Sequence, residues 1–136
     1  MRVMIDTCIS LDLIQQRNDF FNDARDVFEA IKEERIEGFI TVKSLMDIHY
    51  VTKHILHDEY AVRNVLQNLL ILLKLKDSSA HDAIKALNST ITDYEDALMS
   101  ETAISNDIDY IVTRNIKDYK NSTIKAVTPA DLMSIL

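Results

Sequence analysis

Cysteine, glycine and proline are nearly absent from this chain, which has one of each in 136 residues. A single cysteine cannot form an internal disulfide, so a disulfide-stapled scaffold is excluded and a reducing cytoplasm is expected. All-β proteins use many glycines and prolines in their turns, so their scarcity favours helices. No apolar run reaches the ~20 residues that cross a bilayer, and the acid at position 6 is unlike a secretory signal. We therefore expect a cytoplasmic protein with no membrane contact.

Positive charge is also scarce. The chain carries 15 Lys and Arg against 22 Asp and Glu, for a formal net charge of −7. Nucleic-acid binding usually needs a positive footprint, so either the partner is something else, or some acids are clustered and a metal cancels their charge. The length and the ordinary hydrophobic content of 47% fit one globular domain over residues 1–136.

Short apolar runs alternate with helical patterns along the chain. Residues 3–5, 39–42, 110–113 and 124–127 lack polar alternation, which is typical of strands buried on both faces. Helical spacing predicts helices over 22–35, with Gly38 as a stop, and over 45–55 and 59–70; further helices begin near 79, 93 and 129. Residues 71–76 fit either helix or strand, and we favour a strand. The alternation predicts an α/β fold of three α/β/α layers around a central parallel sheet of four or five short strands.

Two predicted helices, from Asn22 to Arg35 and from Glu59 to Leu73, carry more apolar residues than one buried face needs. The run Leu69–Leu73 is the plainest case. Five consecutive apolar residues cannot all point inward from one helix. We therefore expect part of this surface to be covered by a second copy of the chain, giving a homodimer.

Four acids fall where the carboxyl ends of the predicted strands should meet, which is where parallel sheets place their sites. Asp6 ends the first strand, Asp47 follows the second, and Asp96 and Asp118 flank the strand at 110–113. Converging carboxylates repel one another unless a cation neutralises them, and Mg²⁺ and Mn²⁺ prefer oxygen ligands. Taken singly, each acid has a plainer explanation: Asp6 as a turn cap, Asp47 as a solvated helix residue, Asp96 as part of a charged first turn.

The joint pattern resembles the PIN-domain family. The likeness lies in Val3-Met4-Ile5-Asp6-Thr7, in Tyr94-Glu95-Asp96-Ala97-Leu98, in the segment DYIVTRNIKDY from Asp109 to Tyr119, and in Val127-Thr128-Pro129. The resemblance implies a PIN fold and a metal-dependent ribonuclease. Many small relatives of this kind look like the toxin of a VapBC-type toxin–antitoxin pair, so an RNA substrate and an antitoxin protein are the partners it implies.

The resemblance also assigns residues. It makes four acids catalytic, with the first, third and fourth holding Mg²⁺ or Mn²⁺: Asp6, Asp47, Asp96 and Asp118. It gives Thr113 and Asn115 the role of orienting these carboxylates. Three cations around the last acid are placed to hold RNA phosphates, although each lysine alone would ordinarily be a solvated loop residue: Arg114, Lys117 and Lys120.

Two departures from the family pattern leave an alternative open. Cys8 stands where an asparagine is usual, and Asp47 stands where glutamate is frequent and is one methylene shorter. With the net charge, they allow a PIN-fold module that binds RNA or a protein but cleaves poorly. A HAD-type phosphatase would need an acid at position 8, and a receiver domain would need an acidic pair beside Asp6. His54 and His57 have metal-ligand spacing but no evident third ligand.

Overall fold

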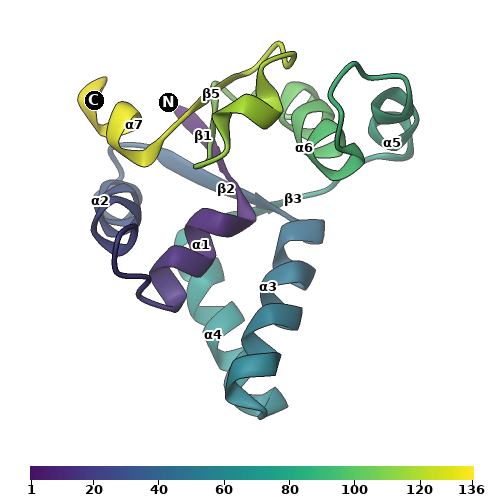
Figure 1. Cartoon of the computed structure of the whole chain (residues 1–136). Coiled ribbons are helices and arrows are strands. Elements are labelled where there is room, and N and C mark those ends of the chain that lie inside the picture. The colour runs from purple at the N-terminus through teal and green to yellow at the C-terminus, as the bar shows by residue number, and fades with distance from the viewer.

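Five parallel strands form one sheet in the computed structural model, which describes residues 1–136 (Figure 1). The strands are β1 (Arg2–Ile5), β2 (Glu37–Thr41), β3 (Lys74–Lys76), β4 (Tyr110–Val112) and β5 (Lys125–Val127). Their order across the sheet is β3-β2-β1-β4-β5, and every neighbouring pair is parallel. The predicted three-layer α/β/α fold with a short-stranded parallel sheet is confirmed.

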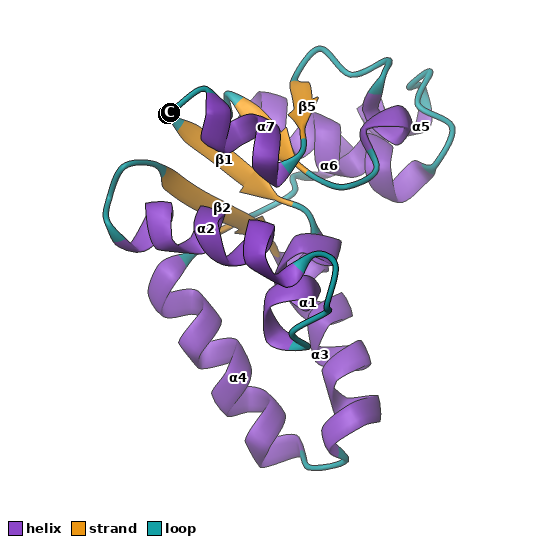
Figure 2. Cartoon of the chain, turned by 60° about the vertical axis from the view of Figure 1, so that its left-hand side comes forward, coloured by secondary structure: helices purple, strands orange, loops and turns teal.

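Helices cover both faces of this sheet (Figure 2). They are α1 (Thr7–Ile14), α2 (Phe21–Lys32), α3 (Val42–Leu56), α4 (Glu59–Leu72), α5 (Ala80–Leu87), α6 (Tyr94–Ser105), the 3₁₀ helix η1 (Ile116–Tyr119) and α7 (Pro129–Ser134). Most begin at a side-chain cap that accepts a backbone N–H. Asp93 caps α6, and Thr128 with Pro129 begins α7 as the sequence predicts. None of the helices is both long and apolar enough to cross a bilayer.

The strand residues alternate between two cores because successive side chains of a strand point to opposite faces. Val3 and Ile5 of β1 join Ile40 in the larger core, which packs under α1, α2, α4 and α7. Met4 and Phe39 point the other way, into a smaller core with side chains of α6. Strand β1 is thus buried on both faces at the middle of the sheet, as its unbroken apolar run indicates.

Helices α3 and α4 form a hairpin that extends away from the sheet (Figures 1 and 2). The turn between them is made by His57, which adopts a left-handed conformation with φ 53°, and by Asp58, which caps α4. Because α3 follows β2 directly, its first turn lies at the carboxyl end of the sheet, beside the end of β1.

Several predicted boundaries need correction. Strand β4 ends at Val112 and not at residue 113, and β5 begins at Lys125 and not at residue 124. The region 71–76 is divided, since α4 continues to Leu72 and only Lys74–Lys76 pair with β2 as a strand. Val42 begins α3 and is not part of β2. Gly38 does not stop a helix: α2 already ends at Lys32, and Gly38 lies inside β2, where a Cβ would come within 2.5 Å of Ile31 and 2.6 Å of Leu73. A side chain at position 38 would displace the ends of the Ile31 and Leu73 side chains, so the glycine lets them pack closely on the sheet.

Candidate active site

Asp6 lies at the carboxyl end of β1 and is both a helix cap and a candidate ligand. Its Oδ1 accepts the N–H of Thr7 at 2.8 Å, and its Oδ2 accepts the hydroxyl of Thr113 at 2.7 Å. The thiol of Cys8 donates more weakly to the same Oδ2, at 3.8 Å. Burial raises the pKa of Asp6, although the hydrogen bonds from Thr113 and Thr7 oppose that shift. These bonds fix the orientation of the carboxylate, so the predicted orienting role of Thr113 fits its contact.

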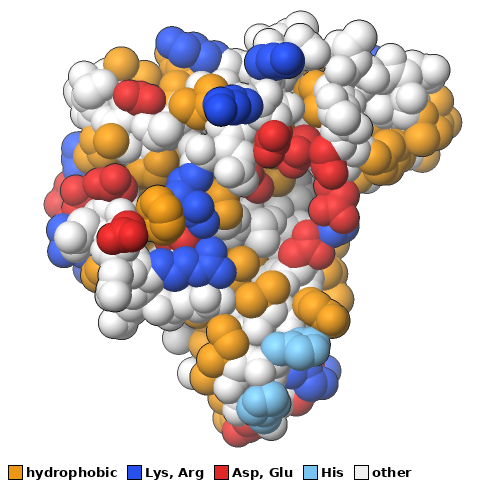
Figure 3. All heavy atoms as spheres, in the orientation of Figure 1, with side chains coloured by type: hydrophobic (Ala, Val, Ile, Leu, Met, Phe, Trp, Pro, Cys, Tyr) orange, Lys and Arg blue, Asp and Glu red, His pale blue; other side chains and the backbone are white.

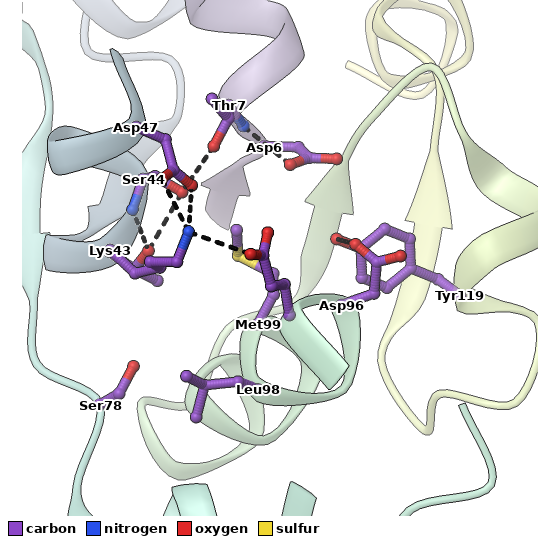
Figure 4. Close-up of a pocket in the computed structure, with 12 residues that line it drawn as sticks. Asp6, Thr7, Lys43, Ser44, Asp47, Ser78, Asp96, Leu98, Met99 and Tyr119 are labelled. Carbon is purple, nitrogen blue, oxygen red and sulfur yellow. Dashed lines mark hydrogen bonds and ion pairs between the residues drawn. The ribbon is translucent and has the colours of Figure 1, made fainter. Parts of the chain in front are cut away.

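Asp96 faces Asp6 from the first turn of α6 (Figure 4). Burial raises its pKa to about 6, and the negative charges of Asp93, Asp6 and Asp118 add to this shift. The hydroxyl of Tyr119 donates to Oδ1 of Asp96 at 3.2 Å, which opposes it. Asp96 is therefore a carboxylate whose negative charge is only partly compensated by its surroundings.

Asp118 joins this cluster from η1. Its negative charge is the smallest of the causes that raise the pKa of Asp6 and of Asp96. A cavity of about 250 Å³ beside Asp96 is lined by Asp118 together with Lys117 and Lys120. The two lysines are thus placed next to the acids, as a phosphate-binding role requires.

Asp47 reaches the same region from the opposite side. With Asp6 and Asp96 it lines a small cavity of about 50 Å³ between α3 and α6 (Figure 4). Both oxygens of Asp47 are engaged by the ammonium group of Lys43, at 2.7 and 2.6 Å. Acidic side chains gather along a hollow on this face of the molecule (Figure 3). The structure thus brings Asp47 to the cavity but pairs it with a lysine.

Arg114 and Asn115 lie apart from the acids. The guanidinium of Arg114 donates to Oδ2 of Asp12 at 2.7 Å and to Oδ1 at 3.3 Å, and it stacks 4.0 Å from the ring centre of Phe20. Asn115 lines the cavity beside this pair, and only its backbone N–H reaches the site, by bonding the Thr113 hydroxyl at 3.0 Å. Because Asp12 is completely buried, the visible role of Arg114 is to neutralise it.

The comparisons with known proteins agree with this geometry. The PIN domain family matches residues 2–117, which is most of the chain. The chain belongs to the PIN domain family. No curated protein sequence gives a significant match to this PIN domain.

Solved structures share the fold of this PIN domain. Rickettsia felis VapBC2 bound to a promoter DNA fragment has 20% identity and a TM-score of 0.73, over 94% of this chain and 98% of that one. A toxin–antitoxin complex from Klebsiella pneumoniae has 22% identity and a TM-score of 0.68, over 93% and 97%. DNA-bound VapBC from Salmonella typhimurium has 18% identity and a TM-score of 0.68, over 95% and 98%. At these identities the likeness establishes the fold.

Sequence reasoning missed several residues of this PIN domain's site. Lys43 and Glu95 line the cavity, and Tyr119 bonds Asp96. Asp12 could have been suspected, because it stands in a helix of mainly apolar residues. Lys43 had a signal too, since it precedes Asp47 by four residues and so faces it on one helix. The contact of Lys43 with Glu95 joins distant segments and has no local signal.

The donors of this PIN domain fit a magnesium or manganese ion. They are carboxylate oxygens, which hard cations prefer, and the raised pKa values of Asp6 and Asp96 mark negative charge that a cation would neutralise. No three His, Cys, Asp or Glu side chains close around one point. An Mg²⁺ ion held here would therefore have few protein ligands and would keep several waters, as Mg²⁺ usually does.

Proposed function

We propose that this PIN domain is a Mg²⁺- or Mn²⁺-dependent endoribonuclease. The observation that carries the proposal is the placement of three acids at the carboxyl end of the sheet: Asp6 and Asp96 line one cavity, and Asp118 lines the next cavity with Asp96. A fold gains nothing from bringing uncompensated carboxylates together, whereas a metal centre for phosphodiester chemistry needs them.

The chain's own residues would hold and orient the reacting groups. Asp6 and Asp96 would bind the ion, with Asp118 bound directly or through water. Thr113 and the N–H of Thr7 keep the Asp6 carboxylate in place. When bound, the divalent ion would supply the positive charge that lets a phosphodiester enter this acidic cavity and would make water a better nucleophile.

Lys117 and Lys120 would hold phosphates that flank the cleaved bond. They line the cavity next to Asp96 and Asp118, and neither has a carboxylate partner within ion-pair distance. Contacts of this kind position a strand without selecting its sequence. They also explain how a chain of net charge −7 can bind RNA at one place.

We further propose that the protein is the toxin of a VapBC-type pair. The support is the near-complete coverage of chains from the VapBC complexes of Rickettsia felis and Salmonella typhimurium and from the toxin–antitoxin complex of Klebsiella pneumoniae. A small antitoxin protein would then be its partner in the cytoplasm. Co-expression with the product of the adjacent gene, followed by affinity purification, tests this part separately from the chemistry.

The nuclease is tested by incubating the protein with a mixed panel of RNAs and Mg²⁺, with EDTA as a control and Asp96→Asn as the matched inactive variant. We expect internal cleavage that EDTA abolishes, that Mn²⁺ restores and that Zn²⁺ supports less well. Cleavage that survives exhaustive EDTA treatment would refute the metal mechanism. RNA binding without cleavage would instead support a PIN-fold binding module, which Cys8 and the Lys43-paired Asp47 favour.

A further inference from the structure

An ammonium group lies at the centre of the acids on one side of the cavity. Nζ of Lys43 is 2.7 Å from Oδ1 and 2.6 Å from Oδ2 of Asp47, and 3.4 Å from Oε1 of Glu95 (Figure 4). All three side chains line the same small cavity as Asp6 and Asp96. The contact with Glu95 crosses from α3 to α6, so it is a tertiary contact.

Local helix energetics do not favour a lysine at this position. Lys43 is the second residue of α3, where the helix dipole presents partial positive charge and disfavours a cation. A lysine that precedes its acid by four residues is also the less favourable order of such a pair. The location of Lys43 is therefore explained by the acids of the cavity and not by the stability of α3. Conflicts of this kind between local preference and placement are expected at functional sites.

Lys43 is positively charged in this setting. Partial burial acts to lower its pKa, but the hydrogen bond to Asp47 and the charges of Asp47 and Glu95 outweigh that effect and raise it. The ammonium group thus supplies a positive charge at the edge of the acidic cavity, on a side chain that is still 44% exposed.

A second divalent ion would need the acids that Lys43 already neutralises. Two-metal sites hold their ions about 3.5–4 Å apart, each with carboxylate ligands. Asp6, Asp96 and Asp118 have no cation within ion-pair distance, whereas both oxygens of Asp47 lie within 2.7 Å of the Lys43 ammonium group.

On the basis of the metal-dependent nuclease above, we propose that Lys43 takes the place of a second metal ion. The centre then binds one divalent cation, between Asp6 and Asp96, and the Lys43 ammonium neutralises Asp47 and Glu95. Lys43 is a positioning residue of the metal centre: it sets the number of ions that the carboxylates hold.

The number of bound ions can be measured without RNA. Mn²⁺ is titrated into the metal-free protein, and the free ion is followed by electron paramagnetic resonance, with calorimetry for affinity. Three proteins are compared: the parent, Lys43→Met, and Lys53→Met. Lys53→Met is the matched control, because Lys53 lies on the same helix and pairs with an acid, Glu59, at 3.1 Å, and its loss changes the net charge equally. Methionine keeps most of the length of the lysine side chain in both variants and removes its charge.

We expect one Mn²⁺ per chain for the parent and for Lys53→Met. Lys43→Met should bind a second Mn²⁺ at least about tenfold more tightly than the parent does, because two carboxylates lose their only nearby cation. Lys43→Arg, which keeps the charge, should again bind one ion. Melting curves check that each variant is folded, and if Lys43→Met is not, Lys43→Gln replaces it.

Each other outcome counts against a different statement. Two ions bound by the parent would overturn the role of Lys43 and leave the nuclease intact. One ion bound by a folded Lys43→Met or Lys43→Gln variant would do the same. If the parent binds no Mn²⁺, both the metal-dependent nuclease and the role of Lys43 are wrong.

Discussion

The hydroxyl of Tyr119 donates a hydrogen bond of 3.2 Å to Oδ1 of Asp96. Burial and the negative charges of Asp6 and Asp96 raise the pKa of Tyr119 well above its ordinary value, so the hydroxyl keeps its proton and acts as a donor. The bond favours the ionised form of Asp96, which is the form that binds a cation. Tyr119 itself is almost fully buried and belongs to the smaller core, so the packing of the sheet fixes the position of its donor.

Replacing Tyr119 with phenylalanine should therefore weaken metal binding mainly at low pH. Without the donor, the pKa of Asp96 rises above about 6, and a proton competes with the cation over a wider range. We expect the pH midpoint of Mn²⁺ binding to move upward, with little change well above neutrality. Tyr110→Phe is the control, because Tyr110 of β4 contacts the larger core and not the acids. Equal midpoints for the parent and Tyr119→Phe would show that the bond does not tune Asp96.

Asp96→Asn tests the same carboxylate through stability. In the metal-free protein, Asp96 has a raised pKa, so its protonated form is favoured by folding and its charged form is not. As the pH rises from about 4 to about 6, the parent should lose stability that Asp96→Asn keeps, because asparagine stays neutral. Urea unfolding in EDTA, near pH 4 and near neutrality, measures this: the two proteins should be similar in acid, and the variant more stable at neutrality.

Adding Mg²⁺ should make the parent more stable than Asp96→Asn at neutral pH, the reverse of the order without metal. An ion that binds only the folded parent stabilises it by about 2.7 kcal/mol at a hundred times its dissociation constant, and Asp96→Asn should lose most of this gain together with RNA cleavage. Melting curves with and without Mg²⁺ decide the matter. Equal shifts in both proteins would remove Asp96 from the metal site.

The fold was predictable from the sequence because its signals are local. The unbroken apolar runs mark β1 and β4, and Thr128 with Pro129 marks the start of α7. The division of residues 71–76 was not predictable, because Leu72 is partly buried from a helix and Leu73 fully buried just after it, so one apolar run serves two elements. Gly38 likewise depends on the approach of Ile31 and Leu73 from other elements.

In the site too, some residues were predictable from the sequence and others were not. Asp6, Asp96 and Asp118 follow from strand ends and from the resemblance to a family, and the structure brings them together. The contacts of Tyr119 with Asp96 and of Lys43 with Glu95 could not be predicted, because each joins distant segments of the chain. No periodicity records which acid a lysine or tyrosine meets across such a contact.

Substitutions of Arg114 and Lys117 should affect different properties: the first the stability of the fold, and the second the binding of RNA. Asp12, with 1% of its side chain exposed, would keep only Arg17 at 3.2 Å if Arg114 were replaced by methionine. Removing one partner of a buried pair costs about 3 kcal/mol, so Arg114→Met should be clearly destabilised in urea. Lys117→Met should be within about 0.5 kcal/mol of the parent, but its RNA binding should weaken and depend less steeply on salt. A stable Arg114→Met that loses RNA affinity would restore the phosphate role expected from the sequence.

Exposed apolar side chains on α3 and α5 form a candidate surface for the expected homodimer. On α3, Val42, Met46 and Tyr50 recur every four residues and are all exposed, so they form a row of apolar side chains on one side of the helix. Helix α5 adds exposed Ile84 and Leu87, and Figure 3 shows hydrophobic side chains both on the upper lobe and lower down on this face. On α4, by contrast, Leu69 is buried and Ile71 is exposed.

We expect light scattering at micromolar concentration to give a dimeric mass for the parent. Tyr50→Glu should give a monomer, because it places a charge in the middle of an apolar surface that a partner would desolvate. Ile71→Glu is the matched control: Ile71 is more exposed than Tyr50, at 78% against 65%, but it stands on another helix. If Ile71→Glu dissociates the dimer and Tyr50→Glu does not, the interface lies on α4 and not on α3. A monomeric parent would contradict the homodimer and would mean that these side chains face solvent or a different protein. A stable dimer would bury about 800 Å² on each partner.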